Sequence, residues 1–245
     1  MIVYLYDGSF EGLLCSFYRA LKTGDDPEEI VSREKGLRPL ASEVREIVTD
    51  RDRAGEVHSG IKDEISSGAA RNVKYCYLSE KSGIEIRLLE YLRLGFRSGS
   101  SLDDKLDQDP VFEIHQLARK VGRERHRMLG LVRFREMERG GYYAPIEPDY
   151  NIVGLLAPHF SSRMRDQNWI LHDRGRDLAV VYNSEEWVLT ELDSDGLPQY
   201  SAEEGLYQHL WRRYFDSASV PGRENEELQR QYMPRRYWDN LIEVD

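Results

Sequence analysis

The first part of the chain changes from strand-like to helix-like spacing of its apolar positions. The run IVYLY at 2–6 is continuous, apolar and rich in β-favouring residues, which predicts a buried strand. After the turn residues DGS, the spacing of apolar side chains becomes helical, and Ser9 is a suitable N-cap. The apolar positions of this helix are Phe10, Leu13, Leu14, Phe17 and Leu21. The segment SEVREIV at 42–48 alternates weakly and predicts a second strand.

Helical spacing dominates the middle of the chain. Apolar stripes that fit one face of a helix lie at 54–65, 69–77, 84–92 and 111–121. A polar, acidic connection, RSGSSLDDKLDQDP at 97–110, separates the third stripe from the fourth. We expect residues 1–245 to form a single compact domain, which this connection could divide into a strand–helix part at 1–97 and a hairpin–helix part at 110–245.

From residue 131 onward the pattern is that of short strands joined by turns. The predicted strands are LVRFREME (131–138), YYAPIEP (142–148), NWILHD (168–173), RDLAVVY (176–182) and EWVLTEL (186–192). The first two are predicted to pair through Gly140-Gly141 and the next two through Arg174-Gly175. Ser201 with Glu204 forms a capping box for a later helix. The fold class is therefore α+β, with a helical middle region packed with antiparallel β-hairpins in the C-terminal half.

Composition excludes several classes of protein. Two distant cysteines supply neither a disulfide framework nor a cluster with zinc-ligand spacing. The first residues lack the features of a signal peptide, and no apolar run approaches the ~20 residues that span a bilayer. No phosphate-binding glycine fingerprint and no GxSxG nucleophile motif occurs. We therefore expect a cytoplasmic protein without a membrane partner and without a bound cofactor.

Charge is distributed unevenly along the chain. Lysine and arginine number 34 against 44 acidic residues, a net charge of −10, which argues weakly against nucleic acid as a partner. Yet residues 119–139 hold seven arginines and one lysine against three glutamates. Arginine suits phosphate because its planar fork donates bidentate hydrogen bonds. The alternative is a solvated helix face with salt bridges to the acidic run at 103–113.

A second constellation lies in PHFSSRMRDQNWILHDRGRD at 158–177. If Arg174-Gly175 form a two-residue turn, His172 lies opposite Asp177, and a carboxylate there would fix the imidazole tautomer for acid–base work. Asp173 and His159 are the other catalytic candidates. The alternatives are that His159 completes an apolar stripe and that HDRGRD is a polar hairpin tip. No spacing among the histidines and Asp173 matches a standard metal motif, so we expect no metal site.

Long blocks of the sequence are similar to a known family. They are YDGSFEGLL (6–14), RERHRMLGLVRF (123–134), YYAPIEPDYNIVGLLAPHFSSRMRDQNWILHDRGRDLAVVY (142–182), LWRRYF (210–215) and LQRQYMPRRYWDNL (228–241). The chain resembles a bacterial family of DNA-metabolism or DNA-repair proteins that carries a domain of unknown function. The resemblance implies DNA as a partner and a companion radical S-adenosylmethionine (radical-SAM) protein. In other members the domain is joined to a uracil-DNA-glycosylase-like domain. Two distant cysteines cannot supply the cysteine triplet of the radical enzyme itself.

These observations lead to one main hypothesis and two alternatives. The main hypothesis is a DNA-repair protein whose arginines converge into one basic cleft that holds the phosphate backbone. The candidate arginines are Arg123, Arg127, Arg133, Arg135, Arg163, Arg174, Arg176, Arg235 and Arg236. In MPRRYW at 233–238, the last two could also stack on unpaired bases, or the aromatic residues could simply dock this segment. The alternatives are a stand-alone His- or metal-dependent hydrolase of a phosphorylated small substrate, and a scaffold whose acidic run docks a basic partner.

Overall fold

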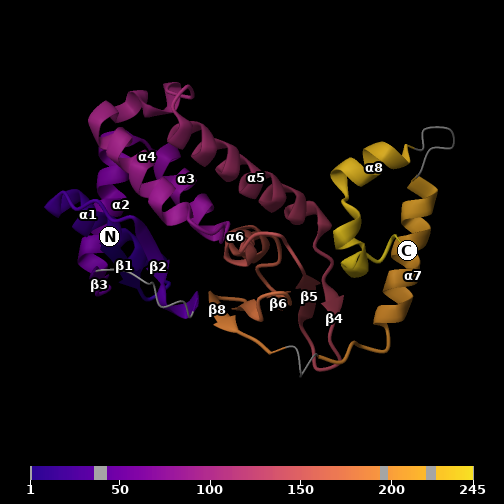
Figure 1. The fold of residues 1–245 in the computed structure, drawn as a ribbon. Helices are drawn as coiled ribbons and strands as arrows, with labels where there is room; N and C mark the ends of the chain where they lie inside the picture. Colours follow the sequence, from indigo (N-terminus) through magenta and orange to yellow (C-terminus); the bar gives the residue numbers. More distant parts are fainter. Residues whose placement is uncertain (1, 36–42, 194–197, 219–224, 245) are drawn as a thin grey trace. The chain divides into compact units, whose positions relative to one another are not determined.

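The computed structural model describes residues 2–35, 43–193, 198–218 and 225–244 (Figure 1). Contacts within the chain divide it into two compact units, Met1–Gly122 and Arg123–Asp245. The division falls inside the longest helix, α5 (Asp109–Leu131). Helices and sheets are both present, which confirms the α+β class. That the whole chain forms one domain stays a prediction.

The first unit combines a small sheet with a helical cluster. Its elements are β1 (Ile2–Tyr6), α1 (Phe10–Thr23), β2 (Glu29–Ser32), η1 (Arg33–Lys35), β3 (Glu43–Glu46), α2 (Arg51–Gly60), the π-helical turn η2 (Ile61–Ile65), α3 (Ser67–Leu78), α4 (Ile84–Ser98), η3 (Gly99–Asp104) and most of α5. The three strands are in the order β2-β1-β3, and both neighbours run parallel to β1. Strands β1 and β3 were predicted, whereas β2 was not.

Local chemistry explains why the first helix begins and ends where it does. Ser9 accepts a hydrogen bond from the backbone N–H of Gly12 at its N-terminus, as predicted. At its other end Gly24 has φ of 72°, and its N–H bonds to the carbonyl of Ala20. Glycine adopts this left-handed conformation without a steric cost, so it terminates the helix. The apolar face between these caps joins one core with β1 and helices α2 to α5.

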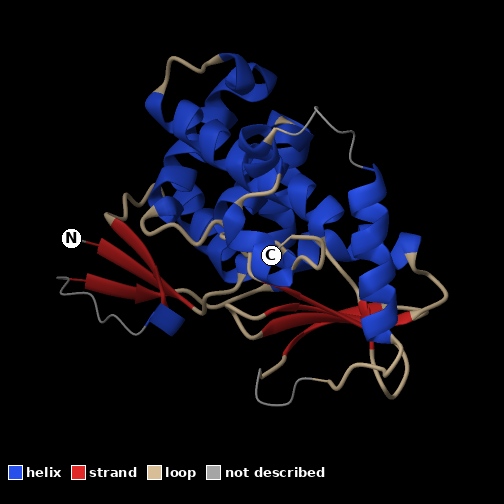
Figure 2. Ribbon diagram, turned by 90° about the vertical axis from the view of Figure 1, so that its right-hand side faces the viewer, coloured by secondary structure: helices blue, strands red, loops and turns tan. Residues whose placement is uncertain are grey.

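The second unit is built around a five-stranded sheet. Its elements after α5 are β4 (Arg135–Glu136), β5 (Tyr142–Ile146), α6 (Val153–Arg163), β6 (Asn168–Asp173), β7 (Leu178–Asn183), β8 (Trp187–Glu191), α7 (Glu204–Ala218), α8 (Glu226–Tyr232) and η5 (Arg235–Asn240). The strand order is β4-β5-β6-β7-β8. Figure 2 draws the strands of both sheets in red. The two predicted hairpins are present as the antiparallel pairs β4–β5 and β6–β7. They are joined by a parallel pairing of β5 with β6, because α6 lies between them and returns the chain in the same direction.

Two local predictions were wrong. The pattern at 131–138 predicts one strand, but α5 continues to Leu131 and β4 contains only two residues. Arg133 therefore lies outside the strand that contains Arg135. The sequence predicts a two-residue turn between β6 and β7. In the structure Asp173 pairs with Leu178, so the turn spans 174–177.

The pairing register divides the side chains of this sheet between two faces. Tyr142 pairs with Trp169, and Trp169 with Tyr182, so these three residues share one face of the sheet. Helix α6 packs on this face, because its Phe160 ring contacts Trp169. Successive residues of a strand point to opposite faces, so Tyr143 and His172 belong to the other face. This separation decides which candidate residues can act together.

Candidate functional site

A groove of about 860 Å³ opens on the second unit, and we call it the α7 groove. Its walls come from the end of α5, the β4–β5 pair, α6 and α7, and Ile242 contributes from the last segment. Six lining side chains are aromatic: Phe134, Tyr142, Phe160, Tyr207, Trp211 and Tyr214. Two arginines, Arg133 and Arg163, and two glutamates, Glu136 and Glu204, also line it. The groove therefore combines flat apolar surfaces with a few charged groups.

A buried carboxylate fixes the position of α7. Glu204 accepts hydrogen bonds from the backbone N–H of Glu136 at 2.8 Å and from the side-chain amide of Gln208 at 2.9 Å. Its own backbone N–H bonds to Ser201 Oγ at 3.2 Å, which confirms one half of the predicted capping box. The other half is absent, because the Ser201 N–H bonds to the Glu136 carbonyl and not to the Glu204 carboxylate. Among the described residues of α7, Glu204 is the one that is buried. The start of α7 is thus tied to the sheet, while the rest of the helix remains accessible.

The accessible face of α7 is rich in large apolar side chains. Leu206, Tyr207, Leu210 and Tyr214 are between 52% and 63% exposed, and Trp211 is 38% exposed. The rings of Trp211 and Tyr214 lie 5.7 Å apart. Soluble proteins seldom leave so many aromatic side chains of one helix in water without a use for them. On the opposite wall Phe134 packs edge-to-face against Phe160 at 5.1 Å.

Arg133 is the most constrained cation of the groove. Its Nη1 donates to the carbonyls of Gly130 at 2.8 Å and Val132 at 3.2 Å, at the C-terminal end of α5. Its Nε donates to Glu243 at 3.1 Å, and Nη2 donates to the other oxygen of the same carboxylate. The guanidinium also lies over the Trp211 ring, 5.5 Å from its centre. Arg133 and Glu243 thus form a bidentate pair beside the indole.

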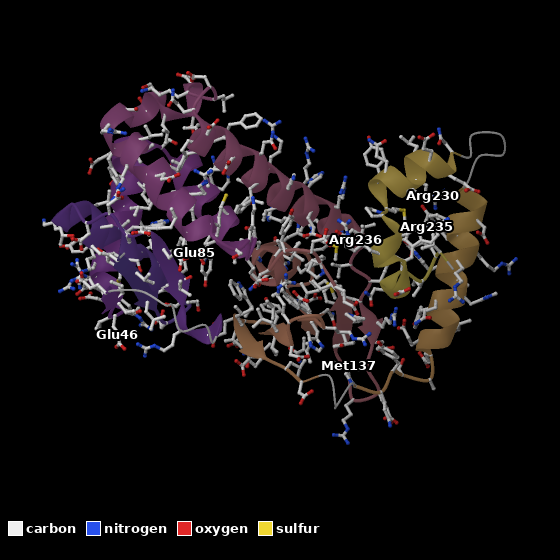
Figure 3. The ribbon with its side chains drawn as sticks, viewed as in Figure 1. Glu46, Glu85, Met137, Arg230, Arg235 and Arg236 are labelled. Carbon is white, nitrogen blue, oxygen red and sulfur yellow. The ribbon has the colours of Figure 1, made fainter. Side chains whose placement is uncertain are left out.

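The other predicted arginines occupy varied environments. Arg163 ends α6, is exposed and forms no ion pair with another described residue. Arg135 lies over the ring of Tyr200 at 5.5 Å and points to the face opposite the groove, because it pairs with Tyr143. Arg174, Arg176 and Arg236 lie near carboxylates, with shortest distances of 3.7, 3.0 and 2.8 Å respectively. Arg235 lies over Trp238 at 5.7 Å, and Arg123 and Arg127 lie on α5. Figure 3 shows Arg235 and Arg236 on the segment that follows α8.

His172 is fully buried and lies on the face of the sheet that does not form the groove. It pairs across the hairpin with Ala179, not with Asp177, because the turn is longer than predicted. Its Nδ1 shares a hydrogen bond of 2.9 Å with the Tyr143 hydroxyl, and its Nε2 forms none of normal geometry with a described residue. Burial lowers the pKa of His172, while the backbone of Leu192 and the charge of Asp177 oppose this shift. A neutral, enclosed imidazole is the consequence.

Asp173 serves a structural connection. It is fully buried, and it accepts hydrogen bonds from Arg176 Nη1 at 3.0 Å and from the backbone N–H of Gly175 at 3.2 Å. The same guanidinium donates to the carbonyls of Pro148 and Asp149. The Asp173–Arg176 pair therefore ties the β6–β7 turn to the loop between β5 and α6. His159, on α6, is half-buried and packs edge-to-face on Phe160 at 5.0 Å.

The described part of the chain contains no three histidine, cysteine, aspartate or glutamate side chains that are grouped so that they could hold a metal ion. No helix there combines the length and the apolar character needed to cross a bilayer.

The chain matches the model of one protein family over about two thirds of its length. A family described as a domain of unknown function, DUF4130, has a model that matches residues 82–243. The chain belongs to the DUF4130 family. No curated protein matches it. The part that matches DUF4130 begins just before α4 and contains every residue that lines the α7 groove, whereas the three-stranded sheet lies outside it.

One central residue of this DUF4130 chain was not among the predicted site residues. Glu124 lies within the arginine-rich segment and is only 2% exposed. Its carboxylate accepts hydrogen bonds from the backbone N–H groups of Asp149 and Tyr150 at 2.8 and 2.9 Å and from the Tyr237 hydroxyl. Arg236 lies 3.8 Å away. A glutamate flanked by arginines in sequence looks like a surface residue, so only its distant partners reveal its role.

The basic side chains of the second unit also share a compositional feature. From Arg123 onward the sequence has sixteen arginines and no lysine. Arginine stacks on aromatic rings and binds carboxylates or phosphates through two parallel hydrogen bonds, which the lysine ammonium cannot do. The cation–π contacts of Arg133, Arg135, Arg235 and Arg236 use the first of these properties.

Proposed function

We propose that the chain binds an unpaired stretch of DNA in the α7 groove, as part of DNA repair or DNA metabolism. The observation that carries the proposal is the row of exposed aromatic side chains on α7, facing a wall that presents arginine. Stacking of bases on aromatic rings together with arginine contacts to the backbone is the general mode of single-strand binding. The volume of about 860 Å³ is in the range of small-molecule pockets and can hold part of a strand.

In this proposal, the arginines that contact DNA are those that line the groove. Arg163 is available for a phosphate because it is exposed and forms no ion pair with a described residue. Arg174 and Arg176 contact neighbouring carboxylates, so they are not part of the proposed interface. The resemblance to DNA-repair proteins supports DNA as the ligand. The companion radical-SAM protein that it implies would then act on the strand that this chain holds.

The aromatic part of the proposal is tested by a matched pair of variants. Tyr214 and Tyr232 are both 63% exposed, but only Tyr214 lines the groove. Stacking is worth about 1–3 kcal/mol per base, so Tyr214→Ala should weaken binding roughly 5- to 100-fold, whereas Tyr232→Ala should leave it unchanged. The measurement is fluorescence anisotropy of a labelled oligothymidylate of about 20 nucleotides. Equal effects of the two variants would remove α7 from the interface.

The electrostatic part uses a second matched pair. Arg163 and Arg165 are both exposed, but only Arg163 lines the groove. Each phosphate contact on a single strand contributes about 0.7 to the slope of log K against log salt. We expect Arg163→Ala to lower this slope by about 0.7 and Arg165→Ala to leave it unaltered. Tighter binding of a duplex than of the single strand would contradict stacking, and an absence of DNA binding would favour a protein segment as the occupant of the groove.

A further inference from the structure

One carboxylate is bound by two of the side chains that line the α7 groove. Glu243 receives two hydrogen bonds from the guanidinium of Arg133 and one from the indole N–H of Trp211, the latter at 3.2 Å. Its side chain is only 1% exposed, and that of Arg133 is 18% exposed. Two parallel N–H donors and a third donor beside them form the arrangement that binds phosphate oxygens as readily as carboxylate oxygens.

We propose that Arg133 and Trp211 form a phosphodiester-binding subsite that Glu243 fills in the absence of DNA, so that the strand binds by displacing this carboxylate. The inference rests on the proposed function and adds a regulatory element to it. Both donors also have contacts that do not involve Glu243, among them the stacking of the Arg133 guanidinium over the Trp211 ring, 5.5 Å from its centre. The Nη1 of Arg133 is fixed by the carbonyls of Gly130 and Val132, and Trp211 lies on α7. These contacts remain available when Glu243 leaves.

The segment that carries Glu243 can move away from Arg133 without disturbing the core. Tyr237 and Leu241 are buried and hold the preceding η5 segment, whereas Ile242 and Glu243 lie beyond these anchors. The carbonyl of Ile242 accepts one hydrogen bond, from Arg212 Nε at 2.6 Å. A buried ion pair gains little net free energy, because desolvation offsets its attraction. Replacing one bound anion by another conserves the hydrogen bonds of Arg133 and exposes no unpaired charge.

The charges beside the groove favour such a displacement. Two arginines and two glutamates, Glu136 and Glu204, line the groove, and Glu243 adds a third carboxylate next to Arg133. Glu136 and Glu204 are held by other groups: the Ser201 hydroxyl donates to Glu136, and backbone and amide N–H groups donate to Glu204. Glu243 is the carboxylate that pairs directly with a groove arginine. Its departure balances the groove charge and frees the donors that a polyanion needs.

The test compares wild type with Glu243→Gln, which keeps an oxygen to accept from Trp211 but removes the charge that binds Arg133. The control is Glu227→Gln, which removes one charge from an exposed position on α8. In 150 mM salt, Glu243→Gln should bind the labelled oligothymidylate at least about fivefold more tightly and raise its salt slope by about 0.7. Glu227→Gln should change affinity less than about twofold, because screening acts over about 8 Å.

A double-mutant cycle links the effect to Arg133. Arg133→Ala should cost less than about twofold in the wild-type background, where Glu243 already occupies the guanidinium, and more than about fivefold in the Glu243→Gln background. Arg133→Lys, which retains the charge, serves as a second variant if the alanine form does not fold. Equal costs in both backgrounds, or an unchanged affinity of Glu243→Gln while Tyr214→Ala still weakens wild type, would overturn the displacement and leave the proposed function standing. Binding by neither wild type nor Glu243→Gln would overturn both, and binding by Glu243→Gln alone would support both.

Discussion

Glu124 provides the sharpest test of how the second unit is held together. Replacing it by alanine removes the acceptor of two backbone N–H groups, those of Asp149 and Tyr150, and of the Tyr237 hydroxyl. A buried donor left without a partner costs about 1–3 kcal/mol. With partial relaxation at this site, we expect Glu124→Ala to lower the free energy of unfolding by about 3–5 kcal/mol. Glu124→Gln keeps one carbonyl oxygen but presents an amide to the second donor, so it should cost about 2 kcal/mol.

The assay is urea unfolding followed by tryptophan emission. All four tryptophans, at positions 169, 187, 211 and 238, lie in the second unit, so the signal reports on that unit alone. With a slope of about 2 kcal/mol/M, Glu124→Gln should lower the midpoint by about 1 M. Glu138→Gln, at an exposed position, is the control and should leave the midpoint within about 0.2 M of wild type. If Glu124→Ala unfolds within about 1 kcal/mol of wild type, the buried hydrogen-bond network does not hold this unit together.

Three further predictions concern buried groups. Arg176→Ala leaves the enclosed Asp173 carboxylate without its ion pair and should cost about 3 kcal/mol in the same assay, whereas Arg174→Ala, whose ion pair is exposed, should stay within about 0.5 kcal/mol. The lowered pKa of His172 means that the unfolded chain takes up a proton near pH 6.5 before the folded chain does. Wild type should therefore lose stability as the pH falls below about 6.5, and His172→Gln should show a flatter dependence; parallel curves would refute this. Burial raises the pKa of Cys76 to about 12, so this thiol should react with a disulfide reagent at pH 8 only after unfolding; labelling of the native chain would contradict its enclosure.

Local patterns predicted the elements well and their pairing less well. The capped helices α1 and α7 and the strands of both hairpins follow from periodicity and turn chemistry, which act over a few residues. The end of α5 was missed because an apolar run such as MLGLVRF fits a buried helix turn and a strand equally well. The parallel β5–β6 pairing depends on how α6 returns the chain, and this is a property of tertiary packing.

The candidate site was predictable only in small part. Of the nine candidate arginines, Arg133 and Arg163 are the two that line the groove, and the aromatic side chains of α7 were not among the predicted site residues. The partner of Arg133 is Glu243, 110 residues away, and that of Glu124 is Tyr237, 113 residues away. Pairings over such separations leave no periodic signal in one sequence. The same is true of the two sheet faces, which place His172 away from the groove.

The replacement of lysine by arginine throughout the second unit restricts how its charge can be controlled. Guanidinium groups stay protonated at every physiological pH, and lysine acetylation has no target after Lys120. The positive charge that these arginines carry is therefore constant. The acidic side chains beside them can change the affinity of this unit for an anion through titration or through physical withdrawal. Amine-reactive labels will also pass over this unit, so a lysine-based footprint of a complex would report on the first unit alone.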